Sequence, residues 1–323
     1  MNKLTIAIPT YNRGKYLPKL LTSILNSKNE NYDILVVDNA STDNTLEYMT
    51  QMTREYSQIN YVRNEKNIGA DGNFLKCYEL ALGEYVLLVG SDDYFEKNAI
   101  DVIIQFLETN PNCDFLFTNF SMFDESRQEK SKPFLNIDSD ITLSNKNSFL
   151  EICDIMITFI SCMVCKKELI TQVENAEQYC GTHFIHTCLF FEATKIRNCH
   201  YGIIAKQCVA ANITPGNGVE EGSFEVFGTC LYSVFMNIGV KCGFEEGVLS
   251  HIFYNFSKKN WFRWIINYKI EKKYKAIEQY RLCRDICLNE HRAYRLFLDF
   301  LLCCPRQMFV MLKRLKRYKS EKK

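Results

Sequence analysis

The stretches LTIAIPTYNRG at residues 4–14 and ILVVDNASTD at residues 34–43 decide the fold class. In each, a short run of apolar residues stops at a polar loop, and apolar residues at helical spacing follow. The second run is almost continuously apolar, as expected for a strand covered on both faces. Further strands are expected at residues 59–62 and 85–89, with a helix between them at residues 72–82. Strands that alternate with helices predict an α/β fold with a mostly parallel sheet and flanking helices.

The middle of the chain is less regular. A strand is expected at residues 114–118, and a helix at residues 149–160 leads into a strand at residues 162–165. From residue 184 onward, helical patterns dominate. We therefore expect a helical extension after the α/β part.

Length and charge divide the chain. Its 323 residues exceed one small module, and we expect an α/β domain over residues 1–222 and a helical, basic region over residues 223–323. Residues 1–257 contain 20 Lys and Arg against 32 Asp and Glu, whereas residues 258–323 contain 19 against 6. The net charges are therefore −12 and +13. No apolar run has the length of a membrane span, because residues 296–312 are interrupted by charged residues and a proline.

The fifteen cysteines indicate reduced thiols. Their number is odd, and the chain opens with Met1-Asn2-Lys3 and not with a signal peptide, so we expect a cytoplasmic protein. Cys162 and Cys165 have the spacing of a zinc or redox motif, but no second such pair accompanies them. We expect them to be small core residues.

Polar loops follow each of the first four predicted strands. They are Pro9–Arg13, Asp38–Asp43, Asn64–Gly69 and Gly90–Asp93. Because sites in open parallel sheets form at the carboxyl ends of the strands, these loops are expected to converge on one rim. The glycine-rich dinucleotide and P-loop signatures are absent, which disfavours dehydrogenases and P-loop enzymes.

The adjacent carboxylates Asp92 and Asp93 predict a cation site. Two neighbouring carboxylates repel each other unless a proton or a cation lies between them. A hard divalent cation with oxygen ligands is the usual solution, and it would bind a diphosphate well.

The ordered set Pro9–Arg13, Val36–Asp43, Lys66–Gly69 and Ser91–Asp93 resembles the motifs of the inverting glycosyltransferases of family 2, which have the Rossmann-like GT-A fold. The resemblance covers about residues 1–125. It implies transfer of a sugar from a nucleoside-diphosphate donor, with inversion at the anomeric carbon and with Mg²⁺ or Mn²⁺ on the diphosphate.

The resemblance also implies roles for single residues. Tyr11 would pack beside the nucleotide base, Asp38 would hydrogen-bond the base, and Asp92 would bind the metal with Asp93 beside it. The full set implied for donor binding is Pro9, Thr10, Tyr11, Asp38, Asn67, Gly69, Ser91 and Asp92.

Three positions depart from the family pattern. Asn39 replaces an aspartate and Ala40 replaces a glycine, and Gly90-Ser91-Asp92 lacks the first carboxylate of the usual DxD motif. This variant, together with the sequence NIGADGN at residues 67–73, resembles the branch that contains abequosyltransferase-type enzymes of surface polysaccharide synthesis.

The catalytic base is not identified by a clear motif. Residues 177–186 lack the acidic pair with which the family removes the proton of the acceptor. The nearest titratable substitutes are His186 and His183, with Glu177 as a third candidate. The loss of acidic groups leaves open a second interpretation, a catalytically impaired scaffold or glycan-binding protein.

The C-terminal region has two interpretations. The segments Trp261–Trp264 and Met311–Tyr318 mix aromatic, apolar and basic residues, as an interfacial helix on an anionic membrane does. Alternatively, residues 296–302 pack inward and the end of the chain is solvated. Nucleic acid is not an expected partner, since the rest of the chain is acidic.

The loop at residues 212–218 is expected either to close over the donor or to be a surface turn.

Overall fold

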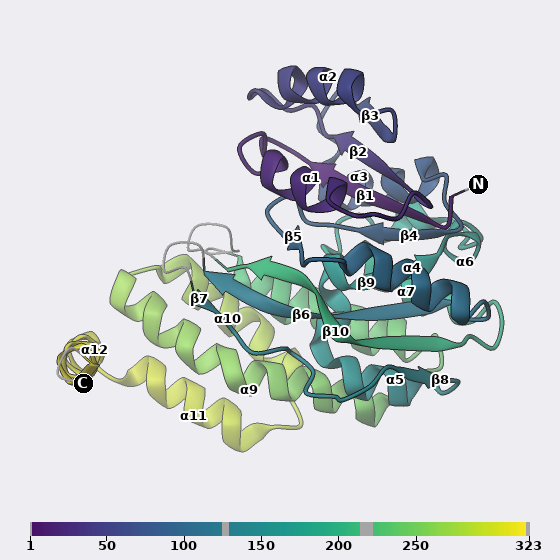
Figure 1. Ribbon diagram of the computed structural model, residues 1–323. Coiled ribbons are helices and arrows are strands. Elements are labelled where there is room, and N and C mark those ends of the chain that lie inside the picture. The colour runs from purple at the N-terminus through teal and green to yellow at the C-terminus, as the bar shows by residue number, and fades with distance from the viewer. Residues whose placement is uncertain (1, 125–128, 214–221, 321–323) are drawn as a thin grey trace. The chain divides into compact units, whose positions relative to one another are not determined.

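The computed structural model describes residues 2–124, 129–213 and 222–320, with side chains up to residue 314 (Figure 1). The chain divides into two compact units. The first takes in residues up to 218 together with 238–245, and the second takes in residues 219–237 and 246–323. The predicted donor loop at residues 212–218 falls mostly outside the described residues.

The first unit is built on one mixed sheet. Its strands are β1 (Leu4–Thr10), β2 (Tyr32–Asp38), β3 (Ile59–Arg63), β4 (Tyr85–Leu88), β5 (Tyr94–Phe95), β6 (Phe115–Asp124), β7 (Glu129–Lys130), β8 (Ile141–Leu143), β9 (Met163–Lys166) and β10 (Tyr201–Asn212). The main order is β3-β2-β1-β4-β9-β6-β10-β5. The pairings give β1, β2, β3, β4, β6 and β10 one direction, and β9 and β5 the opposite one. The expected mostly parallel α/β sheet is confirmed.

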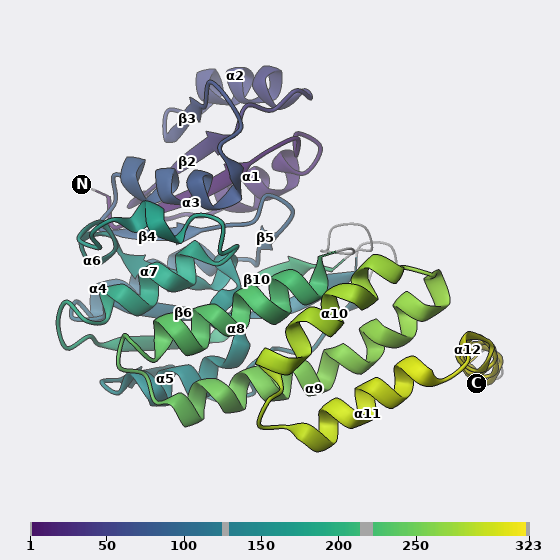
Figure 2. The ribbon, with the colours of Figure 1, turned by 180° about the vertical axis from the view of Figure 1, so that it is seen from behind.

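Helices cover both faces of this sheet. They are α1 (Leu17–Leu25), α2 (Thr45–Glu55), α3 (Gly69–Leu80), α4 (Ala99–Thr109), α5 (Lys146–Cys153), α6 (Lys167–Thr171) and α7 (Ile185–Ala193). Helices α1 and α4 lie on one face, and α3 and α7 lie on the other (Figures 1 and 2). The apolar residues of α1 that recur at helical spacing, Leu17, Leu20, Leu21 and Ile24, are all buried.

The helix predicted over residues 149–160 is shorter than expected. Helix α5 ends at Cys153, because the backbone of Asp154 leaves the helical region, with a φ of 52° and a ψ of −152°. Two 3-10 turns follow, at Asp154–Thr158 and Ile160–Cys162. The second of these turns carries Ser161 to the carboxyl ends of the strands.

The expectation that helical patterns dominate after residue 184 is wrong over β10. This twelve-residue strand pairs with β6 along most of its length. Gly202 allows a close approach, since a Cβ atom there would lie 2.5 Å from the ring of Phe106 on α4. The strand is buried over residues 201–204 and 208–211, and Lys206 at its centre is exposed. Periodicity alone does not separate two such short apolar runs from segments of a buried helix.

The second unit is helical, as predicted. Its main helices are α9 (Glu246–Glu271), α10 (Tyr274–Cys287), α11 (Arg292–Cys303) and α12 (Arg306–Ser320). Trp261 is fully buried and packs against Phe224, Phe253 and Tyr280. The interpretation of Trp261 as a membrane-interface residue is therefore wrong, because its indole ring belongs to the core of this unit. Within the described residues, no helix combines the length and the apolar character needed to cross a membrane.

Candidate active site

The carboxyl ends of three neighbouring strands place their last residues side by side. Thr10 of β1 is in register with Asp38 of β2, and Asp38 is in register with Arg63 of β3. The polar loops that follow these strands therefore start from one edge of the sheet, as the sequence predicts. The hydroxyl of Thr10 is buried and has no hydrogen-bond partner among the described residues.

Asp38 is fully buried and firmly oriented. One carboxylate oxygen accepts a hydrogen bond from the backbone N–H of Ser41 at 2.9 Å. The other accepts from the hydroxyl of Tyr61 at 2.6 Å and lies 3.3 Å from Nε of Arg63. The guanidinium and the hydrogen bonds offset the desolvation of a buried charge. Burial, and then the hydrogen bond to the Asp38 carboxylate, raise the pKa of Tyr61, so its hydroxyl remains a donor.

Tyr61 and Arg63 are site residues that were not predicted from the sequence. They alternate along β3 and so share one face of the sheet beside Asp38. A polar pair at this spacing, at the end of the strand next to the acidic motif, is the signal that could have identified them.

The loops after β1 and β2 are joined by hydrogen bonds. The backbone N–H of Asn12 donates to Oγ of Ser41 at 2.9 Å, and the side-chain oxygen of Asn12 accepts from the N–H of Thr42 at 2.7 Å. The N–H of Gly14 donates to Asp43 at 3.0 Å. Partial burial raises the pKa of Asp43, but hydrogen bonds from Thr45 and Gly14 outweigh this effect and lower it. The two loops therefore form one ordered wall.

Asn39 explains one departure from the family pattern. Its amide nitrogen donates to the side-chain oxygen of Asn67 at 2.9 Å and to the carbonyl oxygen of Gly69 at 3.1 Å. Its amide oxygen accepts from Asn64 and from the N–H of Ile68. A carboxylate cannot donate the first two bonds, so this network requires an amide at position 39. Gly69 has a φ of +80°, which favours glycine.

The two neighbouring carboxylates of the Gly90–Asp93 turn have different environments. Asp93 is buried, accepts from Oγ of Ser161 at 2.5 Å and from the N–H of Asn212 at 3.0 Å, and burial raises its pKa to about 7. Asp92 keeps 22% of its side chain exposed, and its carboxylate lies 4.0 Å from the guanidinium of Arg13. Of the two, only Asp92 is free to bind a ligand.

Only part of the predicted cation site fits the structure. Among the described residues there is no group of three or more His, Cys, Asp or Glu side chains that could hold a metal ion. Asp93 does not fit a ligand role, because both of its oxygens accept internal hydrogen bonds. Asp92 fits a site of one protein carboxylate completed by donor phosphates and water, which is a common arrangement for Mg²⁺.

The other residues predicted for donor binding lie at the same rim. Pro9 and Ser91 are buried at the ends of β1 and β4, and Tyr11 is 45% exposed. Asn67 and Gly69 are exposed at the start of α3. The structure therefore gathers all eight predicted positions at one edge of the sheet, and their individual roles remain predictions.

The two candidate histidines have different surroundings. His186 is buried in α7, its Nε2 lies 2.8 Å from the carbonyl oxygen of Thr158, and its Nδ1 has no partner among the described residues. Burial lowers the pKa of His186 to about 4. His183 is exposed just before α7 and has a φ of 63°, a strained conformation for this residue type. Glu177 is also exposed, in a 3-10 turn before α7.

Asp71, in the first turn of α3, links the loop that contains Asn67 and Gly69 to residues 181–185, which include His183. Its carboxylate accepts from the backbone N–H groups of Gly181 at 2.8 Å and of His183 at 2.9 Å. The N–H of Ile185, at the start of α7, is 3.4 Å away. Asp71 is buried, so these contacts fix the loop that presents His183.

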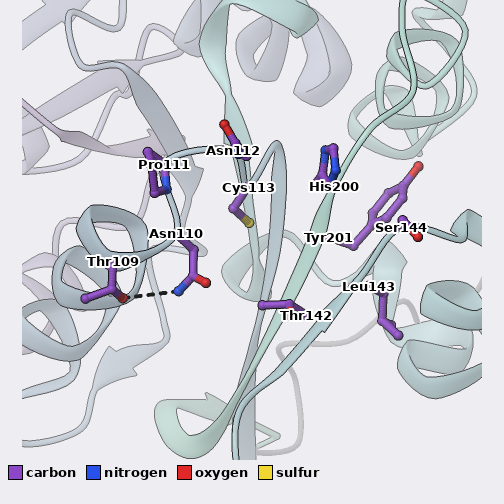
Figure 3. Close-up of a pocket in the computed structure, with 10 residues that line it drawn as sticks. All are labelled: Thr109, Asn110, Pro111, Asn112, Cys113, Thr142, Leu143, Ser144, His200 and Tyr201. Carbon is purple, nitrogen blue, oxygen red and sulfur yellow. Dashed lines mark hydrogen bonds between the residues drawn. The ribbon is translucent and has the colours of Figure 1, made fainter.

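A separate pocket of about 410 Å³ lies away from the carboxyl ends of the strands that carry the candidate site (Figure 3). It is formed around the amino-terminal ends of β6 and β10. None of the predicted site residues lines it. Its walls are residues 109–113, 142–144, His200 and Tyr201.

The fifteen cysteines all lie in the described part of the chain, and none of them forms a disulfide. Cys162 and Cys165 are buried, and burial raises the pKa of Cys165 to about 12. They contribute to the core of the sheet, as expected.

Comparison with known proteins gives a consistent result. Residues 5–170 match the family described as Glycosyl transferase family 2. Abequosyltransferase RfbV of Salmonella typhimurium is 31% identical over 219 residues, which are 64% of this chain and 65% of that protein. The chain thus aligns with slightly less than two thirds of this relative.

Two solved structures share the fold at low sequence identity. S. aureus TarS 1–349 in complex with UDP-GlcNAc superposes with a TM-score of 0.64 at 18% identity, covering 98% of this chain and 92% of TarS 1–349. The mannosyltransferase PcManGT of Pyrobaculum calidifontis, in complex with GDP-Man and Mn²⁺, superposes with a TM-score of 0.54 at 13% identity, covering 97% and 86%. These similarities show the GT-A-like fold.

Proposed function

This chain belongs to glycosyl transferase family 2, and on that premise we propose that it transfers a sugar, with inversion, from a nucleoside-diphosphate sugar to a saccharide acceptor. The observation that carries the proposal is the rim at which Thr10, Asp38 and Asp92 lie on neighbouring strand ends and the loops between them are hydrogen-bonded together. A preorganised polar rim of this kind suits a charged, multi-part ligand.

The donor nucleotide would lie along the ends of β1 and β2. Asp38 is fully buried and bonded to Ser41, Tyr61 and Arg63, so it would support the wall of this pocket from beneath. The exposed ring of Tyr11 would pack beside the base. Pro9 and Thr10 would line this pocket. Asn67 and Gly69 would shape its far side, and Ser91 would set the position of Asp92.

The diphosphate would lie beside Asp92 and Arg13. We propose that Asp92 binds Mg²⁺ or Mn²⁺, in line with the Mn²⁺ that PcManGT contains. Such an ion stabilises the negative charge that develops on the departing diphosphate. Arg13, with its guanidinium 4.0 Å from Asp92, supplies a second positive charge at the same place.

Inversion requires one displacement at the anomeric carbon. The acceptor hydroxyl oxygen forms a bond to this carbon, the bond to the diphosphate oxygen breaks on the opposite side, and the hydroxyl proton passes to a base. We assign the base to His183. It is exposed and held by Asp71, whereas His186 is buried and its lowered pKa makes it a weak base.

The acceptor is proposed to be a growing, lipid-linked saccharide of a bacterial surface polysaccharide. The support is the resemblance to abequosyltransferases, which includes the relative RfbV. The reaction would then take place in the cytoplasm, at the inner face of the plasma membrane.

A donor panel tests the proposal. The protein is incubated with UDP-, GDP-, CDP- and dTDP-sugars and a saccharide acceptor, with and without Mn²⁺, and nucleotide release is measured. The proposed enzyme releases nucleotide from at least one donor, faster with the ion present. A catalytically impaired scaffold or glycan-binding protein, the second candidate, binds a glycan but releases no nucleotide from any donor.

A further inference from the structure

The helices α10, α11 and α12 expose an unusual number of large apolar side chains. Soluble surfaces normally scatter such residues singly, and a contiguous group marks an interaction site. The exposed members on these three helices are Tyr274, Leu282, Ile286, Leu296, Phe297, Phe300, Met308, Met311 and Leu312.

Helix α11 is apolar on two faces. Leu298 and Leu301 are buried, and this face packs on α9. Leu296, Phe297 and Phe300 recur at helical spacing on another face, and they are 65%, 47% and 63% exposed. Packing against α9 accounts for the first face. The second face is left exposed by the residues that the structure describes.

Helix α12 repeats this arrangement with cations added. Phe309 is buried, whereas Met308, Met311 and Leu312 form an exposed apolar stripe. Lys313 and Arg314 follow the stripe directly and are exposed. This helix therefore combines exposed apolar side chains with positive charge within two turns.

Two ion pairs join α10 to α11. Arg284 of α10 forms an ion pair with Asp299 of α11 at 2.5 Å. Arg295 of α11 forms a second ion pair with Asp285 of α10 at 3.0 Å. Leu282 and Ile286 of α10, one turn apart, are also exposed, at 74% and 56%.

We propose that this surface, formed by the exposed apolar residues of α11 and α12 and by Lys313 and Arg314, docks on an anionic lipid bilayer. The apolar side chains enter the boundary between headgroups and acyl chains, and the cations contact the headgroup phosphates. Docking on the surface does not require a helix that spans the membrane.

Charge decides between a bilayer and a second copy of the chain as the occupant. Residues 258–323 carry a net charge of +13, so two copies that met through this surface would repel each other. An anionic bilayer offers the opposite charge and an apolar layer directly beneath it. The inference is independent of the proposed sugar transfer, because docking needs neither donor nor acceptor.

Vesicle co-sedimentation of the full chain tests the proposal. Vesicles of phosphatidylcholine alone are compared with vesicles that also contain phosphatidylglycerol, at low and at high salt. We expect binding to the anionic vesicles only, weakened by salt. The triple variant Leu296→Ser, Phe297→Ser, Phe300→Ser should bind at least about tenfold more weakly, because three large apolar side chains no longer leave water.

Two further variants make the result specific. Leu82→Ser removes a leucine that is 63% exposed but lies outside this surface, and binding should not change. Lys313→Glu with Arg314→Glu keeps every apolar residue, and binding to anionic vesicles should fall. All of these positions are exposed, so the variants should fold, which circular dichroism checks.

Absence of binding to anionic vesicles would overturn the proposal. So would equal binding by the wild type and the triple variant. Analytical ultracentrifugation without lipid adds a third contrary result. A self-association that the triple variant abolishes, in a protein that ignores vesicles, would identify a second copy of the chain as the occupant.

Discussion

At the scale of single residues, near neighbours in the sequence differ in burial. Asp93 and His186 are buried, whereas Asp92 and His183 are at least partly exposed. Asp93 is tied to Ser161 and to the backbone of Asn212, while Asp92 faces Arg13. The position of the acidic motif at a strand end follows from the sequence, since the apolar run that precedes it is unmistakable. The direction of each carboxylate does not, because the partners of Asp93 lie 68 and 119 residues away in the chain.

The two histidines lead to a matched pair of variants. His183→Gln should lower turnover by about 100-fold or more, because it removes the proposed base. His186→Gln preserves a donor toward the carbonyl of Thr158 and should lower turnover much less. Steady-state rates of nucleotide release with a competent donor and acceptor measure both. A larger loss in His186→Gln than in His183→Gln contradicts the assignment of the base.

His186 also makes a prediction about stability. Its pKa is lowered to about 4 in the folded protein from 6.5, so between these values unfolding takes up a proton. The free energy of unfolding therefore falls as the pH falls through this window, and the stabilising contribution of the neutral ring is fully present only above about pH 6.5.

The His186→Gln variant isolates this effect. From about pH 7.5 to about pH 5, the wild type should lose about 2 kcal/mol more stability than the variant does. Urea unfolding at the two pH values measures the difference. If the free energy of unfolding falls equally in the wild type and in the variant, the histidine is not buried in its neutral form.

At the scale of elements, α3 couples two parts of the site that are distant in the sequence. Its amino-terminal loop meets Asn39 beside β2, and Asp71 in its first turn holds the segment before α7. The sequence predicts strands β1, β2, β3 and β4 and the helix between the last two, because their apolar patterns are clear. It does not predict β10, whose two short apolar runs are separated by Lys206 and Gln207. Nor does it predict the anchoring role of Asp71, whose partners are backbone groups about 110 residues away.

Asp71→Ala should disorder the loop that presents His183. Two well-formed hydrogen bonds to a buried carboxylate are lost, and we expect destabilisation by about 2–4 kcal/mol together with a drop in turnover of at least tenfold. Thermal unfolding and nucleotide-release rates measure the two effects.

Asp101→Ala provides the control for this variant. Asp101 of α4 accepts similar bonds from the hydroxyl of Ser27 and the N–H of Asn29, at 2.8 and 2.9 Å, but it contacts none of the proposed site residues. Its removal should lower stability and leave turnover per folded molecule near the wild-type value. Equal losses of turnover in the two variants would argue against a positioning role for Asp71.

At the scale of the whole molecule, the chain leaves the first unit and returns to it. Residues 238–245 belong to the first unit although residues on both sides belong to the second. Phe244 is buried against Phe190 and Phe191, and the ammonium group of Lys146 donates to the carbonyl of Cys242 at 2.7 Å. Composition and charge indicate a two-part chain, but they contain no signal for this return segment.

Truncation tests how far the first unit depends on this segment. A chain that ends at residue 222 lacks Phe244, and we expect its free energy of unfolding to be lower than that of the full chain by about 3 kcal/mol or more. Thermal unfolding followed by near-ultraviolet circular dichroism measures the loss, and Phe244→Ala in the full chain should reproduce part of it. An unchanged midpoint for residues 1–222 would instead support the predicted boundary as the limit of an independent domain.

The central claim is that the rim around Asp38 and Asp92 binds a nucleoside diphosphate together with a divalent ion. Thermal-shift titration of the wild type and of Asp92→Asn, with UDP, GDP, CDP and dTDP and with or without Mn²⁺, tests it most directly. A ligand at about 100 times its Kd adds about 2.7 kcal/mol of stability. We predict that one nucleotide with Mn²⁺ raises the wild-type midpoint by several degrees and that Asp92→Asn loses the Mn²⁺-dependent part of the rise. No rise with any nucleotide, or an undiminished Mn²⁺-dependent rise in Asp92→Asn, would contradict the claim.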